Sequence, residues 1–326
     1  MRRLLIVTML VAACPGCVIV VGSPLGLFGR DRAPLEEVEI DGEGRDKILV
    51  VDVSGVITEQ PTSRAFGLVE EDSTVSRMEA ELDKAADDER VRAVVVHVRS
   101  PGGGVTASDD LHRELVRFRD ERKVPIVAAL GGVAASGGYY LACAADRIVA
   151  HPTTVTGSIG VILLNLNVGG LLEKIGVRDA TVKAGRYKDI LSPLRPERPG
   201  ERRIVQQVVN RLHDRFKDVV RDGRKLEGRR LTAVTDGRIF DAESALAAGL
   251  VDEIGDLDAA IAAAKKAAGL ERARVVRYRR PGESADTLHA RWQGPVDRQP
   301  WASEIELLRN AGPRFMYLWA PELGAP

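Results

Sequence analysis

Ser136 is the residue whose surroundings best suit covalent chemistry. It follows an apolar stretch, 125–130, and a glycine-containing turn, and Gly137 and Gly138 come directly after it. The segment 134–144 has helical composition, so Ser136 would stand at a helix start, where backbone amides and the helix dipole stabilise negative charge. A serine there could attack a carbonyl group and hold the oxyanion that results. The same position suits an N-cap serine without any catalytic role.

A second glycine turn, Ser100–Gly104, lies between an apolar segment at 92–98 and a helical one at 109–121. Glycines allow a ligand to approach the backbone closely, and their N–H groups can point into a site. A phosphate-binding loop is excluded, because the turn has neither a Gly-Lys-Ser/Thr ending nor Gly-x-Gly-x-x-Gly spacing. The alternative is a tight strand-to-helix turn without chemistry.

Activation of a serine hydroxyl requires a base, and histidine is the first residue type to consider. The chain has five histidines: His97, His112, His151, His213 and His289. His151 is the only plausible base among them, because it stands at the end of a strand-like segment and before a proline. The others fall in an apolar strand, on two helical faces that we expect to be exposed, and in an irregular tail.

Lysine is the other candidate base. Lys188 follows a short apolar segment, 180–182, that predicts a strand. A lysine accepts a proton near neutral pH only where desolvation or neighbouring charges lower its pKa. Spacing alone does not show such surroundings, and a solvated lysine remains the alternative.

The elements that must position these residues alternate along the chain. Short apolar runs predict strands, and segments with apolar residues three and four apart predict helices. Near-continuous apolar runs are typical of a sheet that is buried on both faces. The pattern therefore predicts an α/β fold with a largely parallel sheet. We expect strands at 48–53, 92–98, 125–130, 148–150 and 155–164, and helices at 73–88, 109–121, 134–144, 201–221, 242–248 and 257–268.

Composition excludes several classes of protein. The 326 residues include 47 Lys plus Arg and 47 Asp plus Glu, so the net charge is zero. The chain therefore lacks the overall positive charge that is typical of nucleic-acid-binding proteins. With 44% hydrophobic and 29% charged residues, the chain is neither disordered nor a polytopic membrane protein. Three cysteines cannot form a disulfide framework. No cluster has convincing metal-ligand spacing, so we predict no metal and no cofactor.

The N-terminus resembles an export segment. Arg2 and Arg3 precede an uncharged run, 4–29. In one interpretation Val11–Cys14 is a bacterial lipobox, and Cys14 carries the lipid after cleavage. In another, residues 4–28 form one membrane-spanning helix, although two prolines and two glycines interrupt it. Both place the remainder at a membrane, outside the cytoplasm of a bacterial cell. A signal that is fully removed, with soluble secretion, is the third possibility.

Polarity divides the rest of the chain. Residues 30–46 are polar and contain proline and glycine, which is typical of a linker. Residues 47–269 carry the alternating pattern and form the predicted catalytic domain. Residues 270–326 have no clear periodicity, and we treat them as a C-terminal extension of unknown role. Five arginines between 272 and 280 suggest a solvated face or a strand edge, with an anionic lipid contact as the second interpretation.

Several motifs occur in a fixed order along the chain, and together they are specific enough to indicate a protein family. They are Arg99–Val105, Ala134–Ala150, Thr156–Val161, Gly185–Asp189 with Ser192-Pro193, Asp236–Asp241 and Gly249–Gly255. Through them, residues 48–268 resemble the signal peptide peptidase A family of serine peptidases. The resemblance implies the fold shared by the Clp protease and crotonase families, with repeated ββα units and a C-terminal helical part.

The resemblance also implies roles for individual residues. Ser136 matches the family's nucleophile, and Lys188 matches its general base. Ser158 matches a residue that orients the lysine, and the turn at Gly102 and Gly103 matches the oxyanion loop. We add the backbone N–H of Gly137 as a second oxyanion donor, because it follows the nucleophile.

Family members of this length form rings in which neighbouring protomers supply the Ser and the Lys of one site. The resemblance therefore implies that a monomer would be inactive. It also implies leftover signal peptides or other short apolar peptides as substrates, with small apolar side chains preferred.

Three alternatives stay open. A crotonase-like enzyme acting on acyl-coenzyme A would share the fold, but an exported N-terminus argues against it because coenzyme A is cytoplasmic. A Clp-like Ser-His-Asp peptidase would need a well-placed histidine, for which His151 is the candidate. A non-enzymatic scaffold need not keep both Ser136 and Lys188.

Overall fold

The computed structural model describes residues 34–64, 69–281 and 314–319. The predicted export segment, Cys14 and the first part of the predicted linker lie outside these residues. Among the helices that the structure describes, none is long and apolar enough to cross a membrane.

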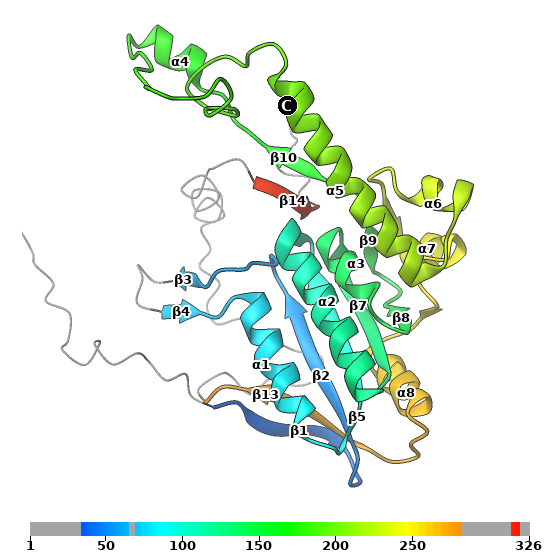
Figure 1. The fold of residues 1–326 in the computed structure, drawn as a ribbon. Coiled ribbons are helices and arrows are strands. Elements are labelled where there is room, and N and C mark those ends of the chain that lie inside the picture. Colours follow the sequence, from blue (N-terminus) through cyan, green and yellow to red (C-terminus); the bar gives the residue numbers. More distant parts are fainter. Residues whose placement is uncertain (1–33, 65–68, 282–313, 320–326) are drawn as a thin grey trace, which may run out of the picture. The chain divides into compact units, whose positions relative to one another are not determined.

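A nine-stranded sheet forms the centre of the fold (Figure 1). Its main strand order is β1-β13-β2-β5-β7-β8-β12, and β9 and β11 continue from β7. The strands from β13 to β12 are parallel, whereas β1 runs antiparallel to β13. The bounds are β1 Glu36–Gly42, β2 Lys47–Ser54, β5 Val91–Ser100, β7 Ile126–Ala135, β8 Arg147–Ala150, β9 Val155–Gly157, β11 Ile239–Asp241, β12 Glu253–Ile254 and β13 Arg274–Arg279.

Both faces of this sheet are covered, as its apolar strands require. Alternate residues of β2 separate into two cores because neighbouring side chains of a strand point to opposite faces. Leu49 and Val51 pack with α1 (Thr74–Ala86), α2 (Val105–Arg122) and α3 (Gly137–Ala142). Ile48 and Val50 pack with α8 (Leu257–Ala267). The central strands are therefore held from both sides, and their carboxyl ends share one edge.

The remaining elements follow β9. A long helix, α5, packs Phe216 into the first core. Two small sheets stand apart from the main one, with the orders β10-β14-β6 and β3-β4. The bounds are β3 Thr62–Arg64, β4 Val69–Glu71, β6 Gly102–Gly104, β10 Ile162–Leu164, α4 Gly169–Lys174, α5 Glu201–Arg224, α6 Gly228–Val234, α7 Ala242–Ala248 and β14 Arg314–Leu318.

The predicted α/β fold is confirmed, and three local predictions are corrected. The helix expected at 134–144 begins only at Gly137, because β7 continues through Ala135 to pair with β9. The strand expected at 155–164 is divided into β9 and β10. The strand expected at 180–182 is absent from this described part of the chain. Val182 is 97% exposed, so the short apolar run has no partner that could bury it.

Strands also form at both ends of the predicted domain. Part of the expected linker forms β1, and part of the expected extension forms β13, between β1 and β2. The arginines at 274, 277 and 279 therefore lie in an internal strand of the sheet, so the expected strand edge was wrong. The division of the chain into domains stays a prediction.

Candidate active site

Ser136 stands between β7 and α3 in a strained backbone conformation. Its φ is 53° and its ψ is −117°, a combination that costs a residue with a side chain about 1–3 kcal/mol. Two main-chain hydrogen bonds hold it there: its N–H donates to the Gly157 carbonyl at 2.8 Å, and its carbonyl accepts from the Tyr140 N–H at 2.8 Å. The hydroxyl makes no capping bond to the helix. Ser136 therefore occupies the N-cap position without using its side chain as a cap.

The two glycine turns predicted separately meet at Ser136. Gly102 has a φ of 103°, and a Cβ atom built on it would lie 2.7 Å from the Gly137 nitrogen. A Cβ atom on Gly137 would lie 3.2 Å from the Gly102 Cα and 2.3 Å from Ser108 Oγ. Only glycine permits this approach at both positions. The N–H of Gly137 belongs to the first turn of α3, where a helix cannot pair its own amides.

Backbone hydrogen bonds to Ile57 stabilise the first glycine turn. The Ile57 N–H donates to the Gly102 carbonyl at 2.9 Å, and the Gly104 N–H donates to the Ile57 carbonyl at 3.0 Å. The Gly102 N–H itself donates to Ser100 Oγ at 3.0 Å. In this structure the amides of Gly102 and Gly104 thus have partners inside the chain, and Gly103 lies opposite Tyr317 of β14.

Ser158 lies beside the candidate nucleophile. The register pairs Ala135 of β7 with Gly157 of β9, so Ser136 and Ser158 each follow one member of this pair. Ser158 is 9% exposed, its φ is 50°, and its N–H donates to the Arg238 carbonyl at 2.8 Å. The structure brings these two serines together.

Lys188 is not joined to them within one chain. It lies in an exposed turn, where its N–H donates to the Gly185 carbonyl at 3.2 Å. Across the described residues, no hydrogen bond or ion pair connects its ammonium group with Ser136 or Ser158. The single chain therefore presents the candidate base to its surroundings.

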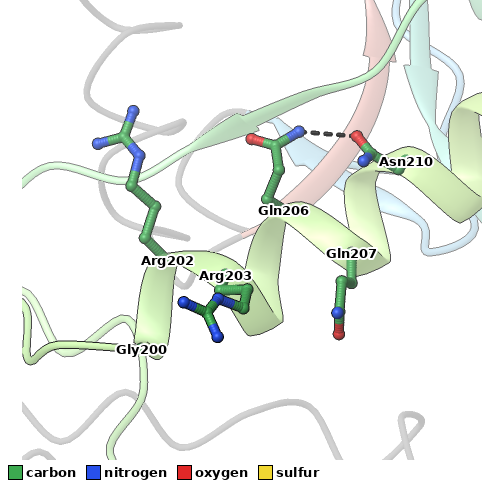
Figure 2. A pocket seen from close by; sticks show the side chains of 6 residues that line it. All are labelled: Gly200, Arg202, Arg203, Gln206, Gln207 and Asn210. Atoms are coloured by element: carbon green, nitrogen blue, oxygen red, sulfur yellow. Dashed lines mark hydrogen bonds between the residues drawn. The ribbon is translucent and has the colours of Figure 1, made fainter.

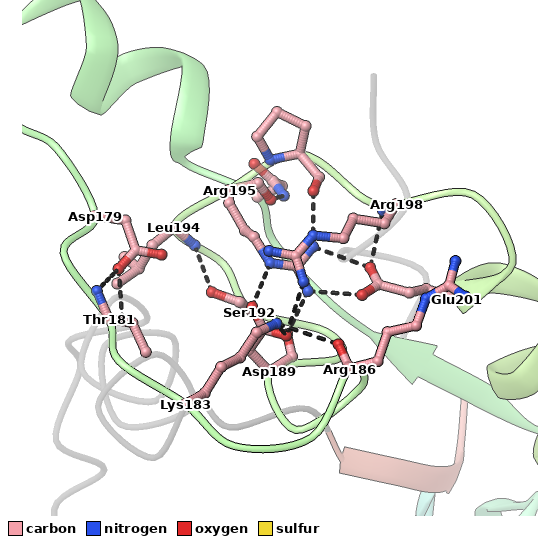
Figure 3. A network of polar contacts seen from close by, with 12 residues as sticks. Asp179, Thr181, Lys183, Arg186, Asp189, Ser192, Leu194, Arg195, Arg198 and Glu201 are labelled. Carbon is pink, nitrogen blue, oxygen red and sulfur yellow. Dashed lines mark hydrogen bonds and ion pairs between the residues drawn. The ribbon is translucent and has the colours of Figure 1, made fainter.

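A polar network braces the segment that carries Lys188 (Figure 3). The guanidinium of Arg195 donates to both carboxylates beside it, at 2.7 Å to Asp189 Oδ2 and 2.7 Å to Glu201 Oε1. It also donates to the Asp189 carbonyl at 2.8 Å, and Lys183 pairs with the Asp189 carboxylate. Hydrogen bonds from Arg195 and Lys183 hold the pKa of the Asp189 carboxyl well below its usual range. The turn next to Lys188 is thus ordered by charge pairing.

Among the described residues, the candidate base His151 does not lie beside Ser136, and His289 lies outside the described residues. His151 is exposed, and its Nδ1 lies 2.8 Å from Thr153 Oγ1. Its neighbour Ala150 pairs with Leu130 of β7, whereas Ser136 follows Ala135 at the end of that strand.

His112 is more buried than its helical position predicted. Its ring lies edge-on to Tyr140, with 5.4 Å between the centroids. Burial lowers its pKa to about 4. The expectation that this histidine is exposed was therefore wrong.

A hollow beside the first turns of α5 holds none of the candidate residues (Figure 2). It is lined by Gly200, Arg202, Arg203, Gln206, Gln207 and Asn210. Gln206 donates to Asn210 at 2.8 Å, and no nucleophile or carboxylate is present. Among the residues that the structure describes, no group of three or more His, Cys, Asp or Glu side chains could hold a metal ion.

Strand β14 is the part of the site that the sequence analysis missed. It pairs with the glycine turn, and the Tyr317 side chain lies in the core with Tyr140 and Phe216. The available signal was a run of aromatic and apolar residues, 315–319, between two prolines. Such a run favours a strand, but its partner is more than 200 residues away.

Comparisons with known proteins identify the family. Residues 118–271 match the model described as peptidase family S49. Over 264 residues the chain is 38% identical to a protein of Enterococcus faecium that carries the provisional name signal peptide peptidase SppA. The match covers 79% of this chain and 76% of that protein. The chain belongs to peptidase family S49.

A second curated relative agrees with this family S49 assignment. The chain is 32% identical over 248 residues to the chloroplastic serine protease SPPA of Arabidopsis thaliana, which covers 74% of this chain and 36% of that one. Among solved structures it is similar to a ClpP1 mutant of Listeria monocytogenes, with 15% identity and a TM-score of 0.41, over 65% of this chain and 94% of that chain. Membership of peptidase family S49, together with the curated relatives, makes the chain a serine peptidase, as the motifs predicted.

Proposed function

We propose that this chain is a membrane-associated serine endopeptidase that uses a Ser–Lys dyad to hydrolyse cleaved signal peptides or other short apolar peptides. The observation that carries the proposal is the strained Ser136 at a strand-to-helix turn, where both glycine turns converge. A serine on such a turn, with backbone amides beside it, has the geometry for acyl transfer.

The proposed mechanism follows general acyl-transfer chemistry. Uncharged Lys188 accepts the proton of the Ser136 hydroxyl while the oxygen attacks the peptide carbonyl. The N–H of Gly137 and the turn at Gly102 and Gly103 stabilise the oxyanion. Lys188 then donates the proton to the leaving amine, and a water molecule hydrolyses the acyl-enzyme by the same sequence of proton transfers. Ser158, beside Ser136, orients the lysine.

We propose that the base comes from a neighbouring protomer in a ring-shaped homo-oligomer. Two observations support this arrangement. Lys188 is exposed in the single chain, and the charge network around Arg195 orders the segment that presents it. An exposed lysine on an ordered segment can insert into the site of a second copy. There it would lie beside Ser136 and Ser158, which have no base in the described part of their own chain's site.

The proposed location rests on the sequence of the N-terminus. We propose that the segment 1–29 anchors the protein in a bacterial cell membrane, as a lipoprotein through Cys14 or as a single-pass anchor, with the catalytic part outside the cytoplasm. Zero net charge gives no reason to expect a nucleic-acid partner, and the proposed reaction requires no cofactor. The intact mass of the mature protein tests this: a diacylglyceryl group on Cys14 supports the lipoprotein, and an unmodified Met1 start supports the span. A start beyond residue 20 without lipid contradicts both.

Activity measurements test the dyad. We expect the full chain to cleave fluorogenic apolar peptides, and we expect Ser136→Ala and Lys188→Ala each to reduce cleavage to background. His151→Ala is the matched control, and it should retain full activity because His151 lies far along β7 from Ser136. Loss of activity in His151→Ala together with an active Lys188→Ala would refute the dyad.

A further inference from the structure

Ser100 is a buried hydroxyl residue that lies between the two glycine turns. It is the last residue of β5, and its exposed fraction is 0%. The register pairs it with Ala134 of β7, which comes two residues before Ser136. Because it pairs within the central sheet, its backbone has a fixed place beside the strand that leads to the nucleophile. The proposed mechanism gives its side chain no role.

The hydroxyl group of Ser100 contacts both polar groups of the Gly102 backbone. Its oxygen accepts a hydrogen bond from the Gly102 N–H at 3.0 Å, and the hydroxyl donates to the Gly102 carbonyl at 3.4 Å. Serine makes local bonds of this kind to the residue two positions later, and they fix the conformation of a turn. The φ of Gly102 is 103°. The hydroxyl therefore selects one conformation of a residue that could adopt many.

The conformation of Gly102 sets the direction of the amide that follows it. A peptide group is planar and trans, so the carbonyl of Gly102 and the N–H of Gly103 point in opposite directions. The Gly102 carbonyl accepts from the Ile57 N–H at 2.9 Å as well as from Ser100. The N–H of Gly103 consequently points away from Ile57.

Ser100 also packs against the helix that follows the nucleophile. A Cβ atom built on Gly138 of α3 would lie 2.8 Å from the Ser100 carbonyl oxygen and 3.4 Å from the Ser100 Cβ atom. The same first turn of α3 contains Gly137, whose N–H is the other proposed oxyanion donor. One buried residue thus contacts both of the turns whose amides the proposed reaction uses.

We propose that Ser100 is a positioning residue for peptide hydrolysis, and that its hydroxyl group fixes Gly102 so that the N–H of Gly103 is directed to the oxyanion. This inference deepens the proposed peptidase function and rests on it. Donors that are already oriented stabilise a transition state best, because they need no reorganisation during the reaction. Ser100 does not touch the substrate, and it acts only through the turn.

Steady-state kinetics of Ser100→Ala test this role. Loss of the hydroxyl leaves the buried Gly102 N–H without its partner, so the turn is no longer fixed. We expect kcat for a fluorogenic peptide to fall about 10- to 100-fold, which is less than the effect of losing an oxyanion donor outright. KM should change by less than about threefold, because the donor acts in the transition state.

Two conservative variants separate the hydroxyl group from the volume that it occupies. Ser100→Thr keeps a hydroxyl group and should restore kcat to about a third of the wild-type value or more. Ser100→Cys keeps nearly the same shape, but a thiol is a weak acceptor, so its kcat should stay close to that of Ser100→Ala. This second comparison remains informative if the added methyl group of threonine prevents folding.

Thr154→Val is the matched control, because Thr154 is a buried hydroxyl residue with its contacts elsewhere. It is 1% exposed, and its Oγ1 donates to the carbonyls of Leu130 and Gly131 at 3.0 and 2.7 Å. The variant should lower the free energy of unfolding about as much as Ser100→Ala does, since each loses a buried hydroxyl group. Its kcat should stay within about twofold of the wild-type value.

Hydrogen exchange resolved to single amides measures the effect on Gly102 without any chemistry. In the full chain with Ser100→Ala, we expect the Gly102 amide to exchange roughly tenfold faster or more, while the amides of β5 and β7 stay protected. Unchanged exchange at Gly102 would overturn the proposal. So would a wild-type kcat in a folded Ser100→Ala chain, or an equal loss of kcat in Thr154→Val. A wild-type chain that cleaves no peptide would instead refute the proposed function, and the exchange rates would still decide whether Ser100 fixes the turn.

Discussion

At the scale of single residues, the site depends on backbone conformations that few side chains allow. Ser136 has a positive φ, and the neighbouring positions 102 and 137 accommodate each other only as glycines. Strain of this kind persists where the surrounding structure compensates for it, here through the hydrogen bonds of Ser136 to Gly157 and Tyr140.

Gly102→Ala tests how closely the two glycine turns must approach. The new Cβ atom would lie 1.9 Å from the Tyr317 carbonyl oxygen and 2.7 Å from the Gly137 nitrogen, at a φ of 103°. We expect kcat/KM to fall about 100- to 1000-fold, as when an oxyanion donor is lost. The free energy of unfolding should fall by about 1–3 kcal/mol. Kinetics with a fluorogenic peptide and thermal unfolding measure the two effects.

Gly132→Ala provides the matched control for this prediction. Gly132 also lies near the site end of β7, but a Cβ atom built there would meet nothing within 4 Å. We expect its activity to stay normal and its stability to change by less than about 0.5 kcal/mol. An active Gly102→Ala chain would show that the turn does not shape the oxyanion site.

The residues of the site were predictable to different degrees. Ser136 and both glycine turns were found because each is a local pattern at a strand-to-helix transition. Tyr317 was not, because only pairing with a turn about 210 residues earlier gives it a role. Local sequence patterns predict turns. They do not predict which distant segment pairs with a strand.

At the scale of elements, the segment that presents Lys188 is organised by charge and has little apolar core of its own. The guanidinium of Arg195 donates to two carboxylates and to two backbone carbonyls, those of Asp189 and Pro196. This geometry uses the planar fork of arginine, which a lysine ammonium cannot reproduce.

Arg195→Lys tests whether that geometry positions the base. We expect the amides of residues 183–201 to exchange faster with solvent, while those of β5 and β7 stay protected. Peptidase activity should fall through kcat, because the proposed base Lys188 is displaced while Ser136 and the two glycine turns are unchanged. Hydrogen exchange followed by mass spectrometry measures the first effect and steady-state kinetics the second. Arg198→Lys is the matched control, because Arg198 makes one longer contact to Asp189 at 3.3 Å; equal effects of the two changes would contradict this prediction.

The same network predicts a dependence on pH. Hydrogen bonds from Arg195 lower the pKa values of Asp189 and Glu201 in the folded chain. The unfolded chain then binds protons more readily, so the stabilisation is fully present above the ordinary carboxyl pKa values, about 4. It is lost as the pH falls below them towards the folded values. Hydrogen exchange of 183–201, corrected for its intrinsic pH dependence, should show no loss of protection from pH 7 to 5 and a progressive loss below pH 4. Loss of protection that is complete at pH 5 would exclude these carboxylates as the cause.

The helices and strands were predicted correctly where buried apolar residues recur regularly along the sequence. The parallel strands β2, β5 and β7 form long apolar runs, because both faces of the sheet are covered. The run at 180–182 is much shorter, and its Val182 is 97% exposed. Strand β1 has a mixed sequence, and its place in the sheet follows from pairing with β13 near the other end of the fold.

At the scale of the whole molecule, no hydrogen bond or ion pair joins the two proposed catalytic groups within the described part of the single chain. Ser136 is buried at a sheet edge, and Lys188 is exposed on a braced segment. Under the proposed mechanism, one chain thus offers a nucleophile without its base and a base without its nucleophile. Closed rings with head-to-tail interfaces satisfy both needs at once, because each copy receives from one neighbour and gives to the other.

Mixing two inactive variants tests this sharing directly. Chains with Ser136→Ala still supply Lys188, and chains with Lys188→Ala still supply Ser136. After subunit exchange of an equal mixture, a site is active when an intact serine meets an intact lysine from its neighbour, which random assembly gives in about a quarter of sites. We therefore expect about a quarter of the wild-type rate with a fluorogenic peptide. Mixing either variant with the double mutant should give none. If native mass spectrometry shows mixed rings and no activity returns, both groups of a site must come from one chain, and Lys188 would have to reach Ser136 by a rearrangement within it.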